Sequence, residues 1–213
     1  TLFRSIKGDS IVQTDGGKTN TSNAAGNTVV DGTKSTATTA AGTAITDGAK
    51  TNTNTADKNV IDDGAGNTNT SNATSNTIAD PNGNTNTATA TSNTLSDNAG
   101  NSNVSNATSN SLTDNAGNSN VSNATSNTLK NAAGDETKVD AKGTTVKDAA
   151  GNTTNVAATG ATVTNAAGDI TKVEATGTTV ADAAGNKATF TKDGVTITKP
   201  GKDTVSLTGN GLD

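Results

Sequence analysis

The sequence predicts an all-β, repetitive fold, and three observations support that prediction. A 17-residue unit recurs along most of the 213-residue chain. Each unit opens on a turn signal such as Asp-Asn-Ala-Gly, and short runs between the turns alternate in hydrophobicity, which is typical of strands. Thr, Asn, Ser and Gly disfavour helix interiors. We therefore expect short strands in a β-prism, β-roll or β-solenoid-like arrangement.

The repeats occur in two lengths. Segments spaced by 16 residues begin at Asp15, Asp31 and Asp47. Segments spaced by 17 residues begin at Asp63, Asp80, Asp97, Asp114, Asn131, Asp148, Asn165 and Asp182. The spacing predicts four parts: a lead-in segment (1–14), 16-residue β repeats (15–62), 17-residue β repeats (63–198) and a C-terminal strand leading into a neck (199–213).

Glycine occupies the fourth position of most 17-residue units. Asp or Asn followed by Gly is common where a chain reverses, because Gly adopts positive φ and Asp or Asn bonds its own backbone. The predicted turn glycines are Gly100, Gly117, Gly134, Gly151, Gly168 and Gly185. Asp193 and Gly194 stand between two β-branched runs and give the strongest hairpin signal in the chain.

Two apolar positions recur and are predicted to form the structural core. The first precedes each turn, at Ile78, Leu95, Leu112, Leu129, Val146, Val163, Val180 and Ile197. The second lies seven residues earlier in the later repeats, at Val139, Val156, Val173 and Phe190. In the middle repeats it stands one place earlier still, at Val104 and Val121. A one-residue shift changes the face of a strand, so we expect a local difference between these blocks or a bulge.

One chain offers too little apolar surface for an ordinary core. Hydrophobic residues make up 29% of the sequence, against about 45% or more in typical globular domains. Stacked repeats cover one another, and several chains around a common axis would bury the apolar stripe further. The alternative is a disordered, low-complexity chain. The agreement of turn and apolar positions from repeat to repeat argues against disorder.

Composition excludes several function classes. Without His or Cys, the chain cannot form a Ser-His-Asp or Cys-His site, a disulfide framework or a thiolate zinc site. We predict that it is not an enzyme and needs no cofactor. A net charge of -5 and two aromatic residues argue against nucleic-acid binding. No apolar run reaches the roughly 18 residues of a membrane-spanning helix, and no signal peptide is predicted.

Three motifs suggest binding, and each has a simpler interpretation. Turn carboxylates such as Asp97 could hold calcium, but each turn offers one carboxylate where calcium takes about six to eight oxygens; no metal site is predicted. The threonines of 51–55 and 85–91 could form an ice-binding face, yet Thr suits any exposed strand. Sequons for glycosylation, which chance supplies in an Asn- and Thr-rich chain, occur at Asn20, Asn69, Asn72, Asn103, Asn106, Asn120, Asn123 and Asn152.

The C-terminal string GNKATFTKDGVTITKPGKDTVSLTGNGLD resembles the passenger region of trimeric autotransporter adhesins, the YadA-like surface fibres of Gram-negative bacteria. Its end, from Val205 to Asp213, is similar to the run that leads into a neck in that family. The Asn/Thr/Gly-rich repeats resemble the family's head and stalk modules. The 17-residue period departs from the family's better known, shorter head repeat, so the left-handed roll of that head is not expected.

The resemblance implies a homotrimeric rod at the bacterial cell surface, extracellular and held by an outer-membrane anchor outside this sequence. It also implies attachment to host matrix proteins, cells or abiotic surfaces, with autoagglutination and biofilm formation. The alternatives are a purely structural spacer of such a fibre, a monomeric β-solenoid of the ice-binding kind, and a phage-type trimeric fibre. Binding to immobilised ligands tests the spacer, while solution mass and thermal hysteresis test the solenoid.

Overall fold

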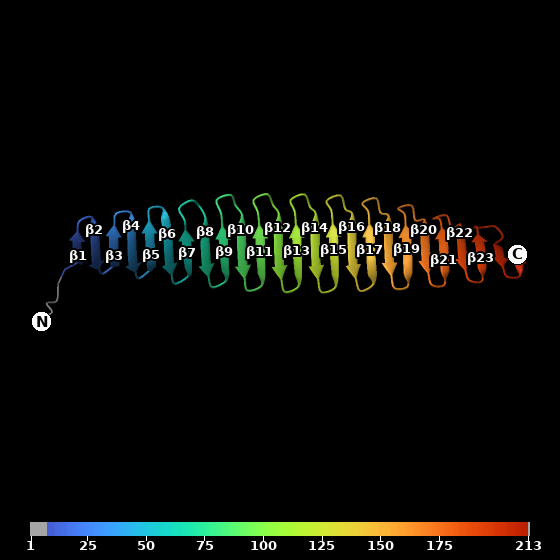
Figure 1. The fold of residues 1–213 in the computed structure, drawn as a ribbon, viewed down its shortest axis with the longest axis horizontal. Coiled ribbons are helices and arrows are strands. Elements are labelled where there is room, and N and C mark those ends of the chain that lie inside the picture. Colours follow the sequence, from blue (N-terminus) through green and yellow to red (C-terminus); the bar gives the residue numbers. More distant parts are fainter. Residues whose placement is uncertain (1–7, 213) are drawn as a thin grey trace. The chain divides into compact units, whose positions relative to one another are not determined.

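The computed structural model describes residues 8–212, and within that range every regular element is a β-strand (Figure 1). Residues 1–7 of the predicted lead-in segment and residue 213 lie outside the described part. The chain divides into two compact units, Thr1–Ala107 and Thr108–Asp213. The division falls inside the stretch of 17-residue repeats.

Unit 1 is an antiparallel meander, in which each strand between the first and the last pairs with the strand before it and the strand after it. Its strands are β1 (Ser10–Asp15), β2 (Lys18–Asn23), β3 (Gly26–Asp31), β4 (Lys34–Thr39), β5 (Gly42–Asp47), β6 (Lys50–Thr55), β7 (Lys58–Asp62), β8 (Thr68–Asn72), β9 (Ser75–Ala79), β10 (Thr85–Thr89), β11 (Ser92–Ser96) and β12 (Ser102–Asn106).

Unit 2 repeats the same connectivity. Its strands are β13 (Ser109–Thr113), β14 (Ser119–Asn123), β15 (Ser126–Lys130), β16 (Glu136–Asp140), β17 (Gly143–Lys147), β18 (Thr153–Ala157), β19 (Gly160–Thr164), β20 (Ile170–Glu174), β21 (Gly177–Ala181), β22 (Lys187–Thr191), β23 (Gly194–Thr198), β24 (Val205–Thr208) and β25 (Gly211–Leu212). The predicted all-β, repetitive architecture is thus confirmed. Successive strands reverse direction here, whereas the coils of a β-solenoid stack in parallel.

The two repeat lengths follow from the turns. In the 16-residue unit that starts at Ser10, two six-residue strands alternate with two two-residue turns, because β2 begins at Lys18 and β3 at Gly26. In the 17-residue unit that starts at Ser92, two five-residue strands alternate with a five-residue turn (97–101) and a two-residue turn (107–108). One residue is therefore lost from each strand and three are gained in one turn, a net gain of one.

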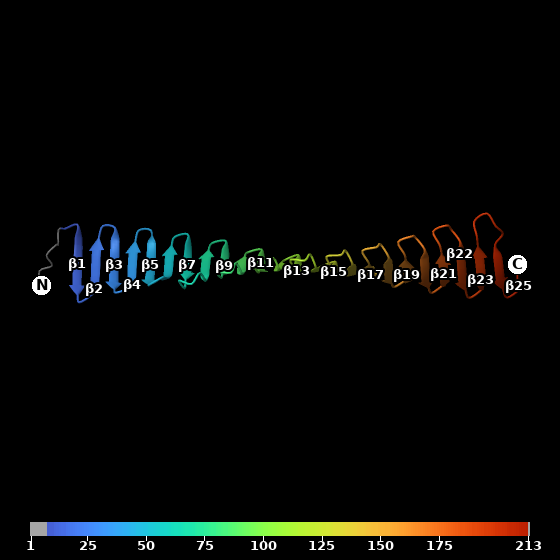
Figure 2. The same cartoon turned by 90° about the horizontal axis from the view of Figure 1, so that it is seen from above.

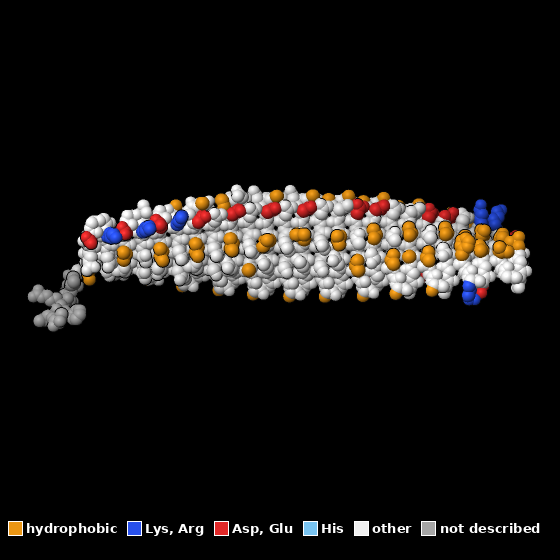
Figure 3. All heavy atoms as spheres, viewed as in Figure 1, with side chains coloured by type: hydrophobic (Ala, Val, Ile, Leu, Met, Phe, Trp, Pro, Cys, Tyr) orange, Lys and Arg blue, Asp and Glu red, His pale blue; other side chains and the backbone are white. Residues whose placement is uncertain are grey.

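Strand register gives each unit two distinct faces. Residues directly opposite one another in a pair lie on the same face, and successive residues alternate between faces. We call the side that carries Ile45, Ile61, Ile78 and Leu95 in unit 1, and Leu112, Leu129, Val146, Val163, Val180 and Ile197 in unit 2, the aliphatic face. The other side is the opposite face. In Figure 3, hydrophobic side chains form a row across successive strands.

Neither unit has a core among the described residues, none of which is buried. Each unit is a single layer of strands (Figure 2), so nothing covers either side. The side chains predicted to form a core are 45–55% exposed: Ile78, Leu95, Leu112, Leu129, Val139, Val146, Val156, Val163, Val173, Val180, Phe190 and Ile197. Their burial by further chains therefore stays a prediction.

The shifted valines change face without a bulge. Val104 stands opposite Thr94 and Val121 opposite Ser111, both on the opposite face. Val139 stands opposite Asn127, on the same face as Leu129. Pairing stays one to one through these strands, so the local difference expected from the sequence is a change of face alone.

The hairpins use two kinds of turn. In the five-residue turns, the glycines at 100, 117, 134, 151, 168 and 185 have φ of 87–99°, and each donates its N–H to the carbonyl of the first turn residue at 3.0–3.2 Å. This is the type I turn with a following left-handed glycine. The hairpin signalled by Asp193-Gly194 is present, but Lys192 and Asp193 form its turn. Gly194 instead opens β23 opposite Thr191, where an added Cβ would lie 2.2 Å from the Leu207 carbonyl oxygen.

Candidate functional surfaces

The aliphatic face of unit 2 gains apolar side chains toward its C-terminal strands. From β13 to β15 one row alternates Leu112, Asn120 and Leu129. From β16 onward a second apolar row joins it, because the even strands now also direct a large side chain to this face. The second row consists of Val139, Val156, Val173 and Phe190, followed by Val195, Leu207 and Leu212.

The aliphatic face of unit 1 is more polar. Aliphatic residues stand on the odd strands from β3 onward, and asparagines fill the same row on most even strands, at Asn20, Asn52, Asn69, Asn86 and Asn103. From β2 onward, a second row of Asn, Ser, Thr and Ala lies two residues away. At one edge, Lys18 pairs with Asp31 at 3.1 Å and Lys34 with Asp47 at 3.7 Å. Such exposed ion pairs contribute little to stability, but they make this edge strongly hydrated.

The opposite face carries hydroxyl groups in unit 1 and charges in unit 2. Thr77 and Thr87 on neighbouring strands are hydrogen-bonded at 3.4 Å, and Thr85 bonds Ser96 at 3.2 Å. The threonines of 51–55 and 85–89 lie on this face through strand alternation. In unit 2, charged pairs occur there between Lys138 and Asp140 at 2.9 Å and between Lys172 and Glu174 at 2.8 Å.

An acidic–amide pair closes every five-residue turn. Asp97 Oδ2 accepts a hydrogen bond from Asn101 Nδ2 at 2.7 Å, and Asp148 Oδ2 accepts one from Asn152 Nδ2 at 2.6 Å. In two turns the residues are exchanged: Asn131 Nδ2 donates to Asp135 at 2.6 Å and Asn165 Nδ2 donates to Asp169 at 2.7 Å. Each turn therefore has one carboxylate and one amide in either order. The sequence analysis did not predict this pair, although the sequence shows Asp and Asn exchanging places between the first and fifth turn positions.

Neighbouring turns are also connected to each other. In unit 2 the fifth turn residue accepts a hydrogen bond from the second residue of the next turn. Ala149 N–H donates to Asp135 Oδ1 at 2.8 Å, and Ala166 N–H donates to Asn152 Oδ1 at 2.9 Å. The carboxylates and amides thus form a ladder along the long-turn edge that fixes the spacing of successive hairpins.

Side-chain hydrogen bonds within the turns lower the pKa of several turn carboxyls. The side-chain N–H of Asn152 stabilises the charged form of Asp148 and lowers the pKa of that carboxyl, with backbone N–H groups adding to the effect. The same cause lowers the pKa of Asp97 and Asp182. These acidic groups bond within their own turns. Over residues 8–212 no cluster of three or more acidic side chains is placed to hold a metal ion.

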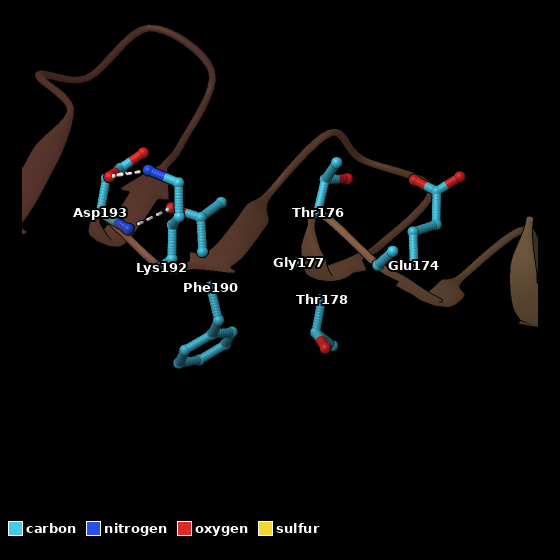
Figure 4. A pocket seen from close by; sticks show the side chains of 9 residues that line it. Glu174, Thr176, Gly177, Thr178, Phe190, Lys192 and Asp193 are labelled. Atoms are coloured by element: carbon cyan, nitrogen blue, oxygen red, sulfur yellow. Dashed lines mark hydrogen bonds and ion pairs between the residues drawn. The ribbon is translucent and has the colours of Figure 1, made fainter.

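One hollow, of about 570 Å³, lies at the short-turn edge of unit 2 between the turn at 175–176 and the turn at 192–193. Figure 4 shows Phe190 and Thr178 pointing to one side of the sheet and Glu174 and Thr176 to the other. Lys192 Nζ is bonded to Asp193 Oδ1 at 2.6 Å. The polar groups therefore do not converge on a common point, and the hollow is an open edge between two hairpins.

Comparisons with known proteins place the fold and leave the family open. No protein-family model and no curated protein matches the chain. A solved structure of the G-box domain of the microcephaly protein CPAP, for which a role in centriole elongation is suggested, is 11% identical to this chain with a TM-score of 0.51, and the match covers 65% of this chain and 96% of that one. The E1021V mutant of the TCP10 domain of Danio rerio CPAP is 9% identical to this chain with a TM-score of 0.47. That match covers 68% of this chain and 90% of the other one.

No helix in the described range is long and apolar enough to cross a membrane. At 11% identity, the similarity to the G-box domain indicates a shared fold and nothing about activity. The chain is thus a repetitive, all-β, antiparallel protein whose fold has a counterpart among solved structures.

Proposed function

We propose that this chain is a segment of a homotrimeric surface fibre of a Gram-negative bacterium, of the trimeric autotransporter adhesin type. It extends the fibre and contributes to attachment to host matrix proteins, cells or abiotic surfaces and to autoagglutination. It lies outside the cell, and an anchor beyond this sequence links it to the outer membrane.

One observation carries the proposal: the described strands form a sheet without a buried residue. Folding must offset the conformational entropy lost in ordering each residue, and half-exposed Val, Leu and Ile side chains leave much of their apolar surface in water. Further chains that cover these side chains supply the missing burial. The resemblance of the C-terminal string to the run before a neck supports three copies of the chain.

The polar surfaces suit attachment through many weak contacts. Hydroxyl, amide and carboxylate groups line the turns and the opposite face, whereas the described residues contain one aromatic side chain, Phe190. Each contact with a partner would be weak, and several chains in many fibres would raise the avidity by multivalency.

The proposal is tested by binding of the purified chain to immobilised collagen, fibronectin and laminin and to bare polystyrene. A heat-denatured sample serves as the control. Saturable binding of the folded protein to at least one of these surfaces supports the adhesin. Absence of binding to all of them, with the trimer intact, assigns the chain to the second candidate role below.

That second candidate is a spacer, and the repeated sequence favours it. The segments 97–110 and 114–127 are identical, and they give the same pairings, with Leu95 opposite Asn103 and Leu112 opposite Asn120. Identical segments present identical surfaces, which serves length better than recognition.

A further inference from the structure

The aliphatic face of β16–β25 carries no charged side chain. Ten strands contribute to it, and register places only Thr, Ala, Val, Ile, Leu and Phe there. The charges of these strands all lie on the opposite face, at Glu136, Lys138, Asp140, Lys147, Lys172, Glu174 and Lys187. A sheet that met water on both sides would not need this separation, which is typical of sheets with one covered face.

The face is large enough for a stable contact between proteins. Ten strands spaced by about 4.8 Å, each about 17 Å long over five residues, give roughly 750 Å² after allowance for the shorter last strands. A stable interface buries about 800 Å² on each partner. The charge-free face of one chain therefore matches the area that a specific partner needs.

The pattern of the face is complementary to itself. Val146, Val163 and Val180 stand on alternate strands, about 9.6 Å apart, and Thr154 and Thr171, which have a similar shape but carry a hydroxyl group, stand opposite them in the same row. A second copy displaced by one strand places its valines over these threonines. Sheets that pack face to face interdigitate in this way at about 10 Å.

The corresponding face of unit 1 is less suited to a dry contact. Asparagines fill the aliphatic row there, and a covered amide costs free energy unless it finds a hydrogen-bond partner. Lys18, Asp31, Lys34 and Asp47 add a hydrated edge to the same face.

We propose that the aliphatic face of β16–β25 binds copies of this same chain and is the principal contact that holds the assembly together. The inference rests on the proposed function in requiring more than one chain. The aliphatic face of unit 1 makes a weaker, wetter contact of its own, and the charged opposite face of unit 2 stays in water.

A matched pair of lysine substitutions tests the proposal on the full chain. Val163 and Thr162 are neighbours on β19 that lie on different faces. Val163→Lys puts a charge into the proposed contact and is expected to raise the concentration of half-dissociation at least about tenfold, so that light scattering gives the single-chain mass. Thr162→Lys is expected to leave the mass unchanged. Equal masses for the two variants, whether both dissociate or neither does, would overturn the proposal.

Unit 1 offers the second comparison. Ile45 and Ala44 are neighbours on β5 with the same division between faces. Ile45→Lys is expected to raise the half-dissociation concentration less than Val163→Lys does. An equal or larger effect of Ile45→Lys would contradict the assignment of the principal contact to unit 2.

Cross-linking keeps the test decisive if Val163→Lys fails to fold. The chain contains no Cys, so a single introduced cysteine reports contact between copies. Val163→Cys is expected to give covalent oligomers with a short bis-maleimide, and Thr162→Cys is expected to stay a single chain. The reverse pattern, or no product from either variant, contradicts the proposal.

The outcomes separate this inference from the proposed function. A wild-type mass of two chains held through Val163 refutes the trimer and supports the contact. A three-chain mass that Val163→Lys leaves unchanged, with no cross-linked product from Val163→Cys, refutes the contact and leaves the fibre standing. Absence of binding to matrix proteins bears on the adhesin alone.

Discussion

Two glycine substitutions in unit 2 test whether strand pairing requires glycine at particular positions. Gly117 lies in a five-residue turn with φ of 92°, and an added Cβ would meet the Ala132 Cβ at 3.8 Å, an ordinary contact. Gly117→Ala therefore costs only the positive φ, about 1–2 kcal/mol. At Gly194 the added Cβ would lie 2.2 Å from the Leu207 carbonyl oxygen and 3.1 Å from Thr208 Cα.

The backbone of β24 would have to move by most of an ångström to admit alanine at position 194. That movement breaks the pairing of β23 with β24, so Gly194→Ala is expected to cost more than about 3 kcal/mol. Urea denaturation followed by circular dichroism at fixed protein concentration measures both changes. Gly209→Ala is the control, because nothing lies within 4 Å of its added Cβ. Equal shifts for Gly117→Ala and Gly194→Ala would refute the reasoning.

Three further predictions follow from the repeat. Deletion of 148–164, one whole repeat, is expected to preserve the β circular dichroism spectrum, because Val146 then stands opposite Thr171 in place of Thr154. Deletion of 148–156 is expected to abolish the cooperative unfolding transition. Equal spectra and unfolding transitions for the two deletions would contradict the repeat account. Asp148→Asn is expected to lower the midpoint of thermal unfolding by about 1–4 °C. Adding Asn152→Asp is expected to restore that midpoint, because Asn165 and Asp169 already occupy their turn in this exchanged order. A double variant no more stable than the single one would contradict the pairing. Folding lowers the pKa of turn carboxyls such as Asp148. The stability that these carboxylates give the folded chain is therefore present above the unfolded pKa of about 3.9 and is lost as pH falls through the folded pKa. Acid unfolding is expected below about pH 4, and an acid-unfolding midpoint above about pH 5 would contradict this.

Local chemistry explains what the sequence could predict. Alternation of polar and apolar residues and the turn chemistry of Asp, Asn and Gly act within a few residues, so strands and reversals were predictable. The hairpin near Asp193 and Gly194 was placed correctly, but its turn lies one residue earlier, because Gly194 is needed for the close approach to Leu207.

Properties that depend on pairing between repeats were harder to predict. The change of face at Val104 and Val121 was one of two open alternatives until the register was known. The origin of the two repeat lengths in turn size was missed, as was the pairing of Asp148 with Asn152. The apolar pattern predicted Val163 as a core residue, and its side chain is half-exposed in a single chain. Such a pattern indicates that a side chain will be covered, but it does not indicate which element or chain covers it.

We propose that this sheet, which buries none of its described residues, depends on further chains to cover it. Light scattering on a size-exclusion column, with circular dichroism of the same peak, tests that claim most directly. We predict a β spectrum at a mass of three times 20.7 kDa, about 62 kDa. A β spectrum at the single-chain mass of 20.7 kDa would contradict it.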